Sequence, residues 1–231
     1  MLERLTETGW PSQTWSAPGY DGQPIAHPYS LSRLAALLED ELRPETGPVV
    51  LVGHSMGGML ALTCAAQWSH PPAAMILLCT VPAFQLRGAA REEFLTRRLA
   101  GIDTPTGMRG AAERLIPTLV AESATPETIA QAVAVMAAIS PETYRQAVTA
   151  LTDFDLRPHL ARMKMPILCL SGVEDRVSTP AHMAALAAAL PNAAHRTHDR
   201  AGHLLPQEQP AWVAAQIHDF LTTRCIPATK I

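Results

Sequence analysis

The chain has 231 residues and a formal net charge of −3, and 48% of its residues are hydrophobic while 17% are charged. This length fits one domain, with room for a small insertion and ample apolar material for a core. A nucleic-acid binder is disfavoured, because the chain is slightly acidic and has no dense run of Lys or Arg. The nearest approach to such a run, Arg97-Arg98, is better explained as the solvated face of a helix.

The cysteines are scattered, and the sequence shows no C-x-x-C pair and no histidine at metal-ligand spacing. Three of the four lie in apolar runs, where a thiol behaves as a small hydrophobic group, so we predict neither a disulfide nor a zinc site. Charges interrupt the start of the chain where a signal peptide needs an apolar core, and no stretch reaches the length of a membrane span. We therefore expect a reduced, cytoplasmic protein without nucleic-acid or membrane partners. The cysteines are Cys64, Cys79, Cys169 and Cys225.

Helical and strand patterns alternate in the first third of the chain. Leu31–Leu42 has apolar residues at three- and four-residue spacing, which predicts an amphipathic helix. Val49–Val52 is a short continuous apolar run, typical of a strand covered on both faces, and a helical pattern over Met56–Gln67 follows it directly. Met75–Cys79 is a second such strand. This alternation indicates βαβ units and a mostly parallel sheet.

The alternation breaks over residues 82–160, which show several helix starts but no good strand. Thr125 and Ser140 each stand as a capping residue before a proline, a combination typical of a helix N-terminus. The stretch is far longer than one crossover connection needs. We therefore predict a helical cap inserted into a core made of residues 1–81 and 161–231. Two ordinary crossover helices are the simpler alternative.

The strand and helix patterns resume after this insertion. Ile167–Leu170 is a third continuous apolar run, and Ala181–Leu190 is a predicted helix with Thr179 as its N-cap and Pro180 at its first position. Ala211–Leu221 is the predicted final helix. The predicted fold class is therefore α/β.

The residues Gly53-His54-Ser55-Met56-Gly57 fit the pattern G-x-S-x-G between a predicted strand and a predicted helix. That context is typical of a nucleophile elbow, a strained turn that presents the serine hydroxyl at the carboxyl end of a sheet. The backbone N–H of Met56 would then face a developing oxyanion. A phosphate-binding turn is the alternative, but the stretch lacks both G-x-G-x-x-G and a Walker lysine.

A nucleophilic serine needs a base, and the base needs an orienting carboxylate. Asp175 stands just after the third predicted strand, and His203 stands in a Gly-His loop before the last helix. The order Ser55, Asp175, His203 is one in which such triads occur. Glu174, next to Asp175, is the rival acid, and a solvated acidic turn is the simpler interpretation of both.

Other titratable groups compete for the same roles. Asp153 and Asp155 lie at the end of the predicted cap, where we expect them at helix termini or on the surface. His198 lies within or beside the last strand, where a structural role is more common. His54 could line the pocket but points away from the nucleophile in an elbow. The other histidines are interpreted as surface groups: His27, His70, His159, His182, His195 and His218.

From about Trp15 to its C-terminus the chain resembles the α/β-hydrolase superfamily. The matching motifs are GHSMGG, the strand followed by SGVEDRVSTP, and AGHLLPQEQP before the final helix. Within that superfamily, the end of the cap and MKMPILCLSG resemble the bacterial 3-oxoadipate enol-lactonase and small carboxylesterase branch. The resemblance implies an α/β-hydrolase fold, with a mostly parallel sheet flanked by helices and a helical cap.

The superfamily pattern begins with strands that lead to a His-Gly oxyanion loop, then a helix, then a strand ending in a Pro-Gly turn. SQTWSAPGYDGQP resembles that last strand and turn, and LERLTETGW resembles the tail of the helix. No His-Gly loop precedes them, so we expect the N-terminal strands to be missing, the middle of the sheet to be open and one oxyanion donor to be lost. The sequence leaves open a shortened version of a longer enzyme or a local rearrangement.

These observations predict a serine hydrolase that cleaves a small carboxylic ester or lactone, with no metal or organic cofactor. Ser55 attacks the carbonyl, His203 takes its proton, Asp175 orients His203, and the Met56 N–H holds the oxyanion. Carbon–carbon bond hydrolases and cofactor-free haloperoxidase-like enzymes of the superfamily share this triad and cap. A catalytically weak, hydrolase-like binding protein is the alternative from a different class.

Overall fold

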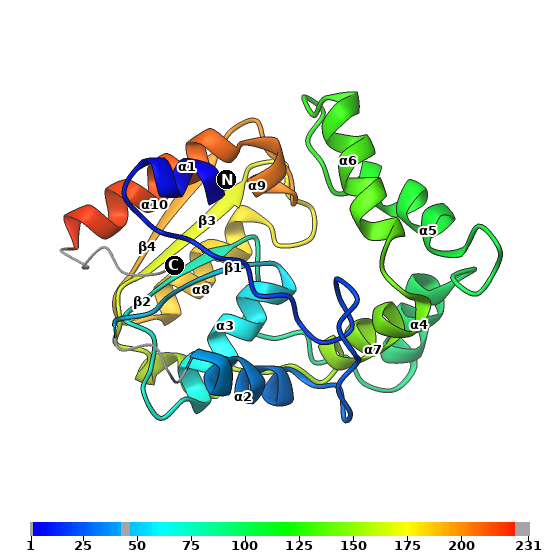
Figure 1. The fold of residues 1–231 in the computed structure, drawn as a ribbon, viewed down its shortest axis with the longest axis horizontal. Helices are drawn as coiled ribbons and strands as arrows, with labels where there is room; N and C mark the ends of the chain where they lie inside the picture. Colours follow the sequence, from blue (N-terminus) through cyan, green and yellow to red (C-terminus); the bar gives the residue numbers. More distant parts are fainter. Residues whose placement is uncertain (1, 43–46, 225–231) are drawn as a thin grey trace.

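The computed structural model describes residues 2–42 and 47–224, so Cys225 lies outside the described residues. A central sheet lies between two layers of helices (Figure 1). All neighbouring strands are parallel, and they follow the order β1-β2-β3-β4. Because parallel strands point the same way, their carboxyl ends meet at one edge. The strands are β1 (Val50–His54), β2 (Ala74–Leu78), β3 (Ile167–Gly172) and β4 (Ala193–His198).

The helices that pack on the sheet begin and end close to the predicted residues. The predicted bounds of α2 and α3 are matched at both ends, and the other two predicted helices shift by one or two residues, as is usual for helix ends. The helices of this part of the chain are α1 (Leu2–Glu7), α2 (Leu31–Leu42), α3 (Met56–Gln67), α8 (Pro180–Ala189), α9 (Leu205–Glu208) and α10 (Pro210–Thr223).

The two faces of the sheet bury different helices because side chains alternate along a strand. On β2, Ala74, Ile76 and Leu78 face the cluster built by α1 and α10. Met75 and Leu77 face the opposite cluster, built by α3 and α8. All five are at most 1% exposed, as the continuous apolar run predicts for a strand covered on both sides.

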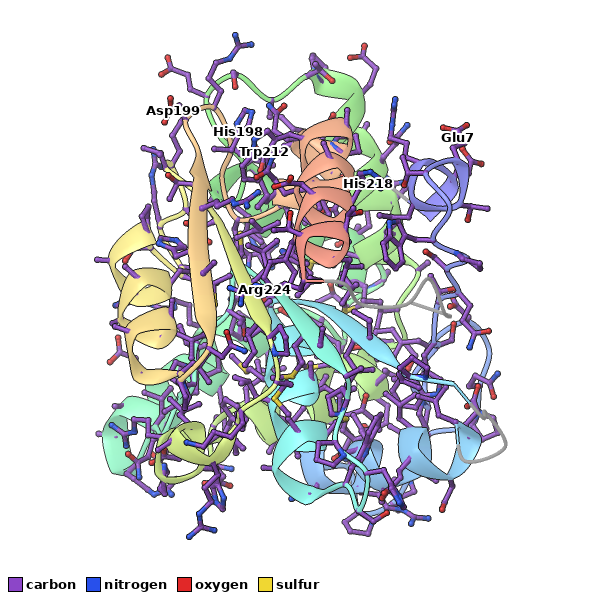
Figure 2. All side chains as sticks on the ribbon, turned by 90° about the vertical axis from the view of Figure 1, so that its left-hand side faces the viewer. Glu7, His198, Asp199, Trp212, His218 and Arg224 are labelled. Atoms are coloured by element: carbon purple, nitrogen blue, oxygen red, sulfur yellow. The ribbon has the colours of Figure 1, made fainter. Side chains whose placement is uncertain are left out.

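The N-terminal residues cover the first of these faces. Leu5 of α1 is fully buried, and the indole N–H of Trp10 donates to His218 Nδ1 of α10 at 3.1 Å. Figure 2 shows α1 and α10 side by side, with His218 on α10 turned toward α1. The start of the chain therefore contributes to the core as a helix and a loop.

The segment around Trp15 is not the strand that the sequence predicts. A strand forms only beside a partner that satisfies its N–H and C=O groups. β1 is an edge of the sheet, and no described residue before Val50 forms a strand beside it. Trp15 instead packs against α2, and its indole N–H donates to Glu41 Oε2 at 2.8 Å. Within the described residues the sheet lacks the N-terminal strands, as predicted, but β1 to β4 pair without a gap, so its middle is closed and not open.

Residues between β2 and β3 form a group of helices on one side of the molecule (Figure 1). The two connecting segments run antiparallel: the Phe84 N–H donates to the Phe154 carbonyl at 2.8 Å, and the Leu86 N–H donates to the Thr152 carbonyl at 2.9 Å. The division of the chain into core and cap at residues 82 and 160 stays a prediction. The helices are α4 (Gly88–Leu99), α5 (Gly107–Leu115), η1 (Ile116–Thr118), α6 (Pro126–Ala137), α7 (Pro141–Leu151) and η2 (Arg157–Arg162).

Three predicted N-caps are present. Thr125, Ser140 and Thr179 each accept a hydrogen bond from the backbone N–H three residues later, at 3.2, 3.0 and 3.3 Å. A proline follows each of them at a position where a missing N–H costs nothing. Within the described part of the chain, no helix has both the length and the apolar character that crossing a bilayer requires.

Candidate active site

Ser55 lies in the turn between β1 and α3 with a strained backbone, at φ 52° and ψ −114°. Residues other than glycine rarely adopt such a positive φ, and the strain costs about 1–3 kcal/mol. The turn is fixed from both sides, because the Ser55 N–H donates to the Leu78 carbonyl at 2.9 Å and the Ser55 carbonyl accepts from the Thr80 hydroxyl at 2.8 Å. The strand-turn-helix sequence thus holds the side chain at the carboxyl edge of the sheet.

Glycines allow this turn to close. A Cβ on Gly53 would lie 2.3 Å from the Gly57 carbonyl oxygen, and one on Gly58 would lie 2.7 Å from the Thr80 side chain. A Cβ on Gly57 would meet nothing within 4 Å. Close packing therefore requires glycine at Gly53, the first position of G-x-S-x-G, and at Gly58, the residue after the motif.

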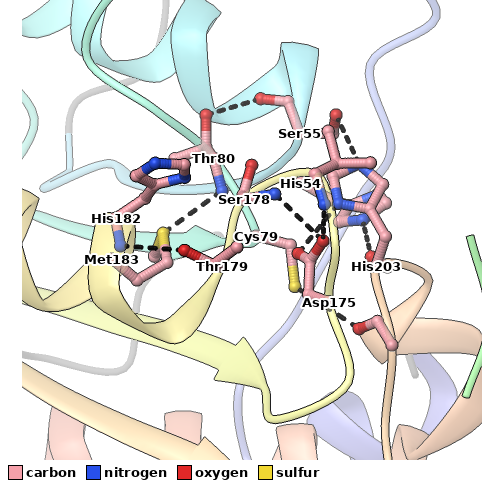
Figure 3. A network of polar contacts seen from close by, with 12 residues as sticks. His54, Ser55, Cys79, Thr80, Asp175, Ser178, Thr179, His182, Met183 and His203 are labelled. Carbon is pink, nitrogen blue, oxygen red and sulfur yellow. Dashed lines mark hydrogen bonds and ion pairs between the residues drawn. The ribbon is translucent and has the colours of Figure 1, made fainter.

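The three residues named from the sequence meet at this edge (Figure 3). His203 Nε2 lies 2.9 Å from Ser55 Oγ, and His203 Nδ1 lies 2.9 Å from Asp175 Oδ2. The side chain of Asp175 is fully buried and that of His203 is 6% exposed. The other oxygen of Asp175 accepts the backbone N–H groups of Val177 and Ser178 at 2.7 and 2.9 Å.

These contacts keep Asp175 ionised. Burial alone would raise its pKa, but hydrogen bonding and charge attraction from His203, together with two backbone N–H donors, lower the pKa of Asp175 below its usual value. An ionised carboxylate accepts hydrogen bonds only, so His203 carries its proton on Nδ1. His203 Nε2 is then free to accept the proton of the Ser55 hydroxyl.

The loop that carries His203 is closely packed on both sides. A Cβ on Gly172, at the end of β3, would lie 2.2 Å from the Ala201 carbonyl oxygen. A Cβ on Gly202 would lie 2.7 Å from backbone atoms of Leu119 and Val120. No larger residue fits at either glycine without moving backbone, so the loop has little freedom to shift.

Two glutamates join residues 119–122 to the loops of the site. Glu208 accepts from the Gly202 N–H at 3.0 Å and from the Ala121 N–H at 2.7 Å. Glu174 accepts from the Glu122 N–H at 2.8 Å, so this rival acid is directed to backbone there while Asp175 faces His203. No sequence pattern singles out Glu208, because it contacts a segment that is distant in sequence.

Comparison with known proteins assigns this chain to a family. The family model described as "Alpha/beta hydrolase family" matches residues 14–216. The chain belongs to the α/β-hydrolase family. The predicted resemblance is thereby confirmed.

Named relatives lie within this family. A pimeloyl-[acyl-carrier protein] methyl ester esterase of Xanthomonas oryzae pv. oryzae is 30% identical over 190 residues, which span 79% of this chain and 71% of the relative. A thermophilic esterase from Thermogutta terrifontis superposes with a TM-score of 0.80 at 27% identity, covering 90% of this chain and 78% of the other. The enol-lactonase from Burkholderia xenovorans LB400 shares the fold, with a TM-score of 0.78 at 24% identity over 90% of this chain and 79% of the lactonase.

His54, the residue before Ser55, contacts His203 instead of Ser55. Its Nε2 lies 2.6 Å from the carbonyl oxygen of His203, and the two rings lie 5.3 Å apart (Figure 3). A carbonyl only accepts, so His54 Nε2 carries a proton. Burial, followed by the charge of His203, lowers the pKa of His54 to about 4. In this α/β-hydrolase His54 is therefore neutral and holds the backbone of His203.

His54, Cys79 and His203 place potential metal-ligand atoms within 4.8 Å of one another. The nitrogens of His203 are engaged by Ser55 and Asp175, and His54 Nε2 is engaged by a carbonyl. Burial also raises the pKa of the Cys79 thiol well above its usual value, whereas a metal ligand must be a thiolate. Hydrogen bonding within the site accounts for this cluster.

Two histidines interpreted as surface groups are half-buried and hydrogen-bonded. His218 accepts from Trp10, and His195 Nε2 lies 2.9 Å from the hydroxyl of buried Ser171. His218 lies on α10 and His195 lies on β4. The identity of a single residue does not show whether its side chain is on the inward face of such an element. His198 is the last residue of β4, as predicted, and Asp153 forms a surface ion pair with Arg87 at 2.6 Å.

Replacing His54 should separate its hydrogen bond from its packing. We expect His54→Phe to lower kcat for a simple ester about tenfold, because it leaves the His203 carbonyl without its donor. His54→Gln keeps an N–H donor and should retain most of the activity. Steady-state kinetics of both variants test this, and equal losses would show that shape alone matters.

The same residue should affect stability at acidic pH. Since the folded protein holds His54 neutral down to about pH 4 and the unfolded chain protonates it near its model value of 6.5, the free energy of unfolding should decrease as pH falls through this window. In His54→Gln this contribution should disappear. Urea unfolding at a series of pH values measures it, and an unchanged slope would contradict it.

Gly202→Ala tests the packing of the His203 loop. The added methyl group has to displace the backbone of residues 119–121 or the loop itself, so we expect a large loss of kcat in a protein that still folds. Gly110→Ala is the matched control, because its Cβ would meet nothing closer than 3.4 Å and lies within α5. Equal activity of the two variants would contradict the expectation.

Proposed function

We propose that this α/β-hydrolase is a serine esterase that cleaves a small carboxylic ester or lactone through an acyl-enzyme intermediate. The observation that carries the proposal is the continuous hydrogen-bonded series from Ser55 Oγ through both nitrogens of His203 to Asp175, with 2.9 Å at each step. The named activities of the Xanthomonas and Thermogutta relatives support ester hydrolysis as the general reaction.

In the first half of the reaction, Ser55 Oγ attacks the ester carbonyl while His203 Nε2 takes the hydroxyl proton. Asp175 keeps His203 in the required tautomer and stabilises the imidazolium that forms. The negative charge on the carbonyl oxygen then develops near the N–H of Met56, the first residue of α3. A helix N–H at this position has no partner within the helix, so it can donate to the oxyanion.

The tetrahedral intermediate collapses when His203 returns the proton to the leaving alcohol oxygen. In the second half, His203 removes a proton from water, the resulting hydroxide attacks the acyl group, and the proton passes back to Ser55 Oγ as the acid departs. A lactone follows the same path, with the alcohol remaining attached to the product. The buried carboxylate of Asp175 keeps its charge throughout.

Replacing the nucleophile is the decisive test of this proposal. Ser55→Ala should abolish labelling by a fluorophosphonate probe and lower kcat for 4-nitrophenyl acetate by at least about 10⁴-fold. Ser32→Ala is the matched control, because Ser32 is exposed on α2 and its hydroxyl contacts Gln67, at the end of α3 away from Ser55. Labelling of Ser55 without turnover would favour the hydrolase-like binding protein instead, and labelling that survives in Ser55→Ala would sink the proposal.

Asp175→Asn tests the orienting role. An amide can donate to His203 Nδ1 and so stabilise the wrong tautomer, and we expect kcat to fall by about 10⁴-fold. The variant should also lose the stability that the ionised carboxylate provides above its unfolded pKa, which in the native protein disappears as pH falls through the lowered folded pKa. Asp153→Asn, at an exposed ion pair, should change kcat little; a comparable loss there would argue against a specific role.

A further inference from the structure

A cavity of about 770 Å³ lies between helices α4, α5 and α7 and the loop that follows β3. This volume suits a small molecule rather than a macromolecule. Its lining joins apolar side chains with several guanidinium groups. The lining residues used below are Phe94, Leu119, Tyr144 and Val177 with the arginines Arg97, Arg98, Arg114 and Arg176.

The charge of this lining is strongly positive although the whole chain carries −3. The lining contains four arginines but only one carboxylate, that of Glu93. Within the described part of the chain none of the four forms an ion pair, whereas Arg87, Arg145 and Arg196 each pair with an aspartate. The Arg114 guanidinium donates to the Ala100 carbonyl at 3.0 Å, but a neutral carbonyl does not compensate its charge, so the positive charge of all four side chains remains available to an anion.

The surroundings of the arginines favour an anion attached to an apolar chain. Arg98 is half-buried and lies over the ring of Phe94, 5.7 Å from its centroid, which fixes the guanidinium plane. Burial raises the pKa of Tyr144, and Arg98 opposes that rise, so the phenol stays a neutral donor. The sequence predicts a solvated helix face for Arg97-Arg98; Arg97 is exposed, but both arginines line the cavity.

Two of the segments that line the cavity also contact residues of the triad. Arg176 and Val177 follow Asp175 directly, and the Val177 N–H donates to its carboxylate. Leu119 lines the cavity, and its carbonyl accepts the His203 N–H at 2.7 Å. A ligand in the cavity therefore lies against segments whose backbone also contacts Asp175 and His203.

We propose that this arginine cavity, lined by Arg97, Arg98, Arg114 and Arg176, binds an anionic group at the far end of the ester substrate. The substrate class is then an ester whose acyl chain ends in a carboxylate or a phosphate-type group, both of which guanidinium groups bind well. The inference rests on the proposed esterase function for its placement of the ester at Ser55. It adds the charge requirement that the triad alone does not impose.

Matched substrates test the charge requirement. Methyl hexanoate, monomethyl adipate and the methyl ester of 5-phosphonopentanoic acid present the same ester and the same four methylene groups with a neutral, a carboxylate or a phosphonate end. We expect kcat/KM to be at least about tenfold higher for one or both anionic esters, the value of one charge-assisted hydrogen bond. The preferred ester identifies the anion, and equal kcat/KM for all three would overturn the inference.

Arg97→Gln combined with Arg114→Gln should remove this preference, because kcat/KM should fall at least about tenfold more for the anionic esters than for the neutral ester. Both side chains are exposed, so the double variant should fold. Arg109→Gln is the control on the same helix as Arg114, because Arg109 is exposed and paired with Glu113 outside the cavity. A preference that persists in the double variant would overturn the inference.

Binding measured without turnover separates this inference from the proposed function. Calorimetric titration of Ser55→Ala with monomethyl adipate and the phosphonate ester should show binding that weakens with added salt, as expected for partly exposed charges, and that is lost with Arg97→Gln and Arg114→Gln. Such binding without any Ser55-dependent turnover in the parent would sink the esterase function and keep the anion site. Turnover of neutral esters without anion binding would overturn the anion site and keep the esterase function.

Discussion

The parallel pairing of the four strands brings the residues of the site to one edge of the sheet. His54 pairs with Leu78 at the end of β1 and β2, and Gly172 pairs with His198 at the end of β3 and β4. Because all four strands point the same way, the residues that follow them emerge at one edge. Ser55 and His203, 148 residues apart in sequence, meet there within 2.9 Å.

The parallel strands bring the side chains of the site to one edge of the sheet but do not fix their distances. Close packing of backbone on backbone positions these side chains within hydrogen-bond distance of one another. Gly53, Gly172 and Gly202 each stand where a Cβ would overlap backbone atoms of another turn or loop. These contacts act together with hydrogen bonds to the Ser55 carbonyl and N–H to maintain a strained conformation that costs about 1–3 kcal/mol. The strain at Ser55 is offset by close packing that only glycine permits at these positions.

The sequence predicts those parts of the structure that depend on local chemistry. The bounds of α2 and α3 follow from apolar spacing, three N-caps follow from a capping residue before proline, and the elbow follows from the order of strand, serine and helix. The distances among Ser55, Asp175 and His203 agree with the roles that the sequence assigned, although those roles stay a proposal. In each case the deciding residues lie within a few positions of one another.

Other features depend on neighbours that the sequence does not disclose. The stretch around Trp15 has the composition of a strand, but no described strand lies beside β1 to pair with it, so it packs as a loop. His218 and His195 were placed on the surface because their partners, Trp10 and Ser171, are distant in sequence. The arginine cavity likewise depends on bringing three helices and the loop after β3 together.

Leu119 shows how the helices between β2 and β3 join the chemistry to the space beside it. Its carbonyl holds the N–H of His203, its side chain lines the arginine cavity, and Glu208 anchors the backbone two residues later. Each charge-assisted hydrogen bond of Glu208 contributes about 1.5–3 kcal/mol, which is enough to keep this segment against the loop. The wall of the cavity and the support of His203 are therefore the same piece of backbone, so a shift of this backbone alters both.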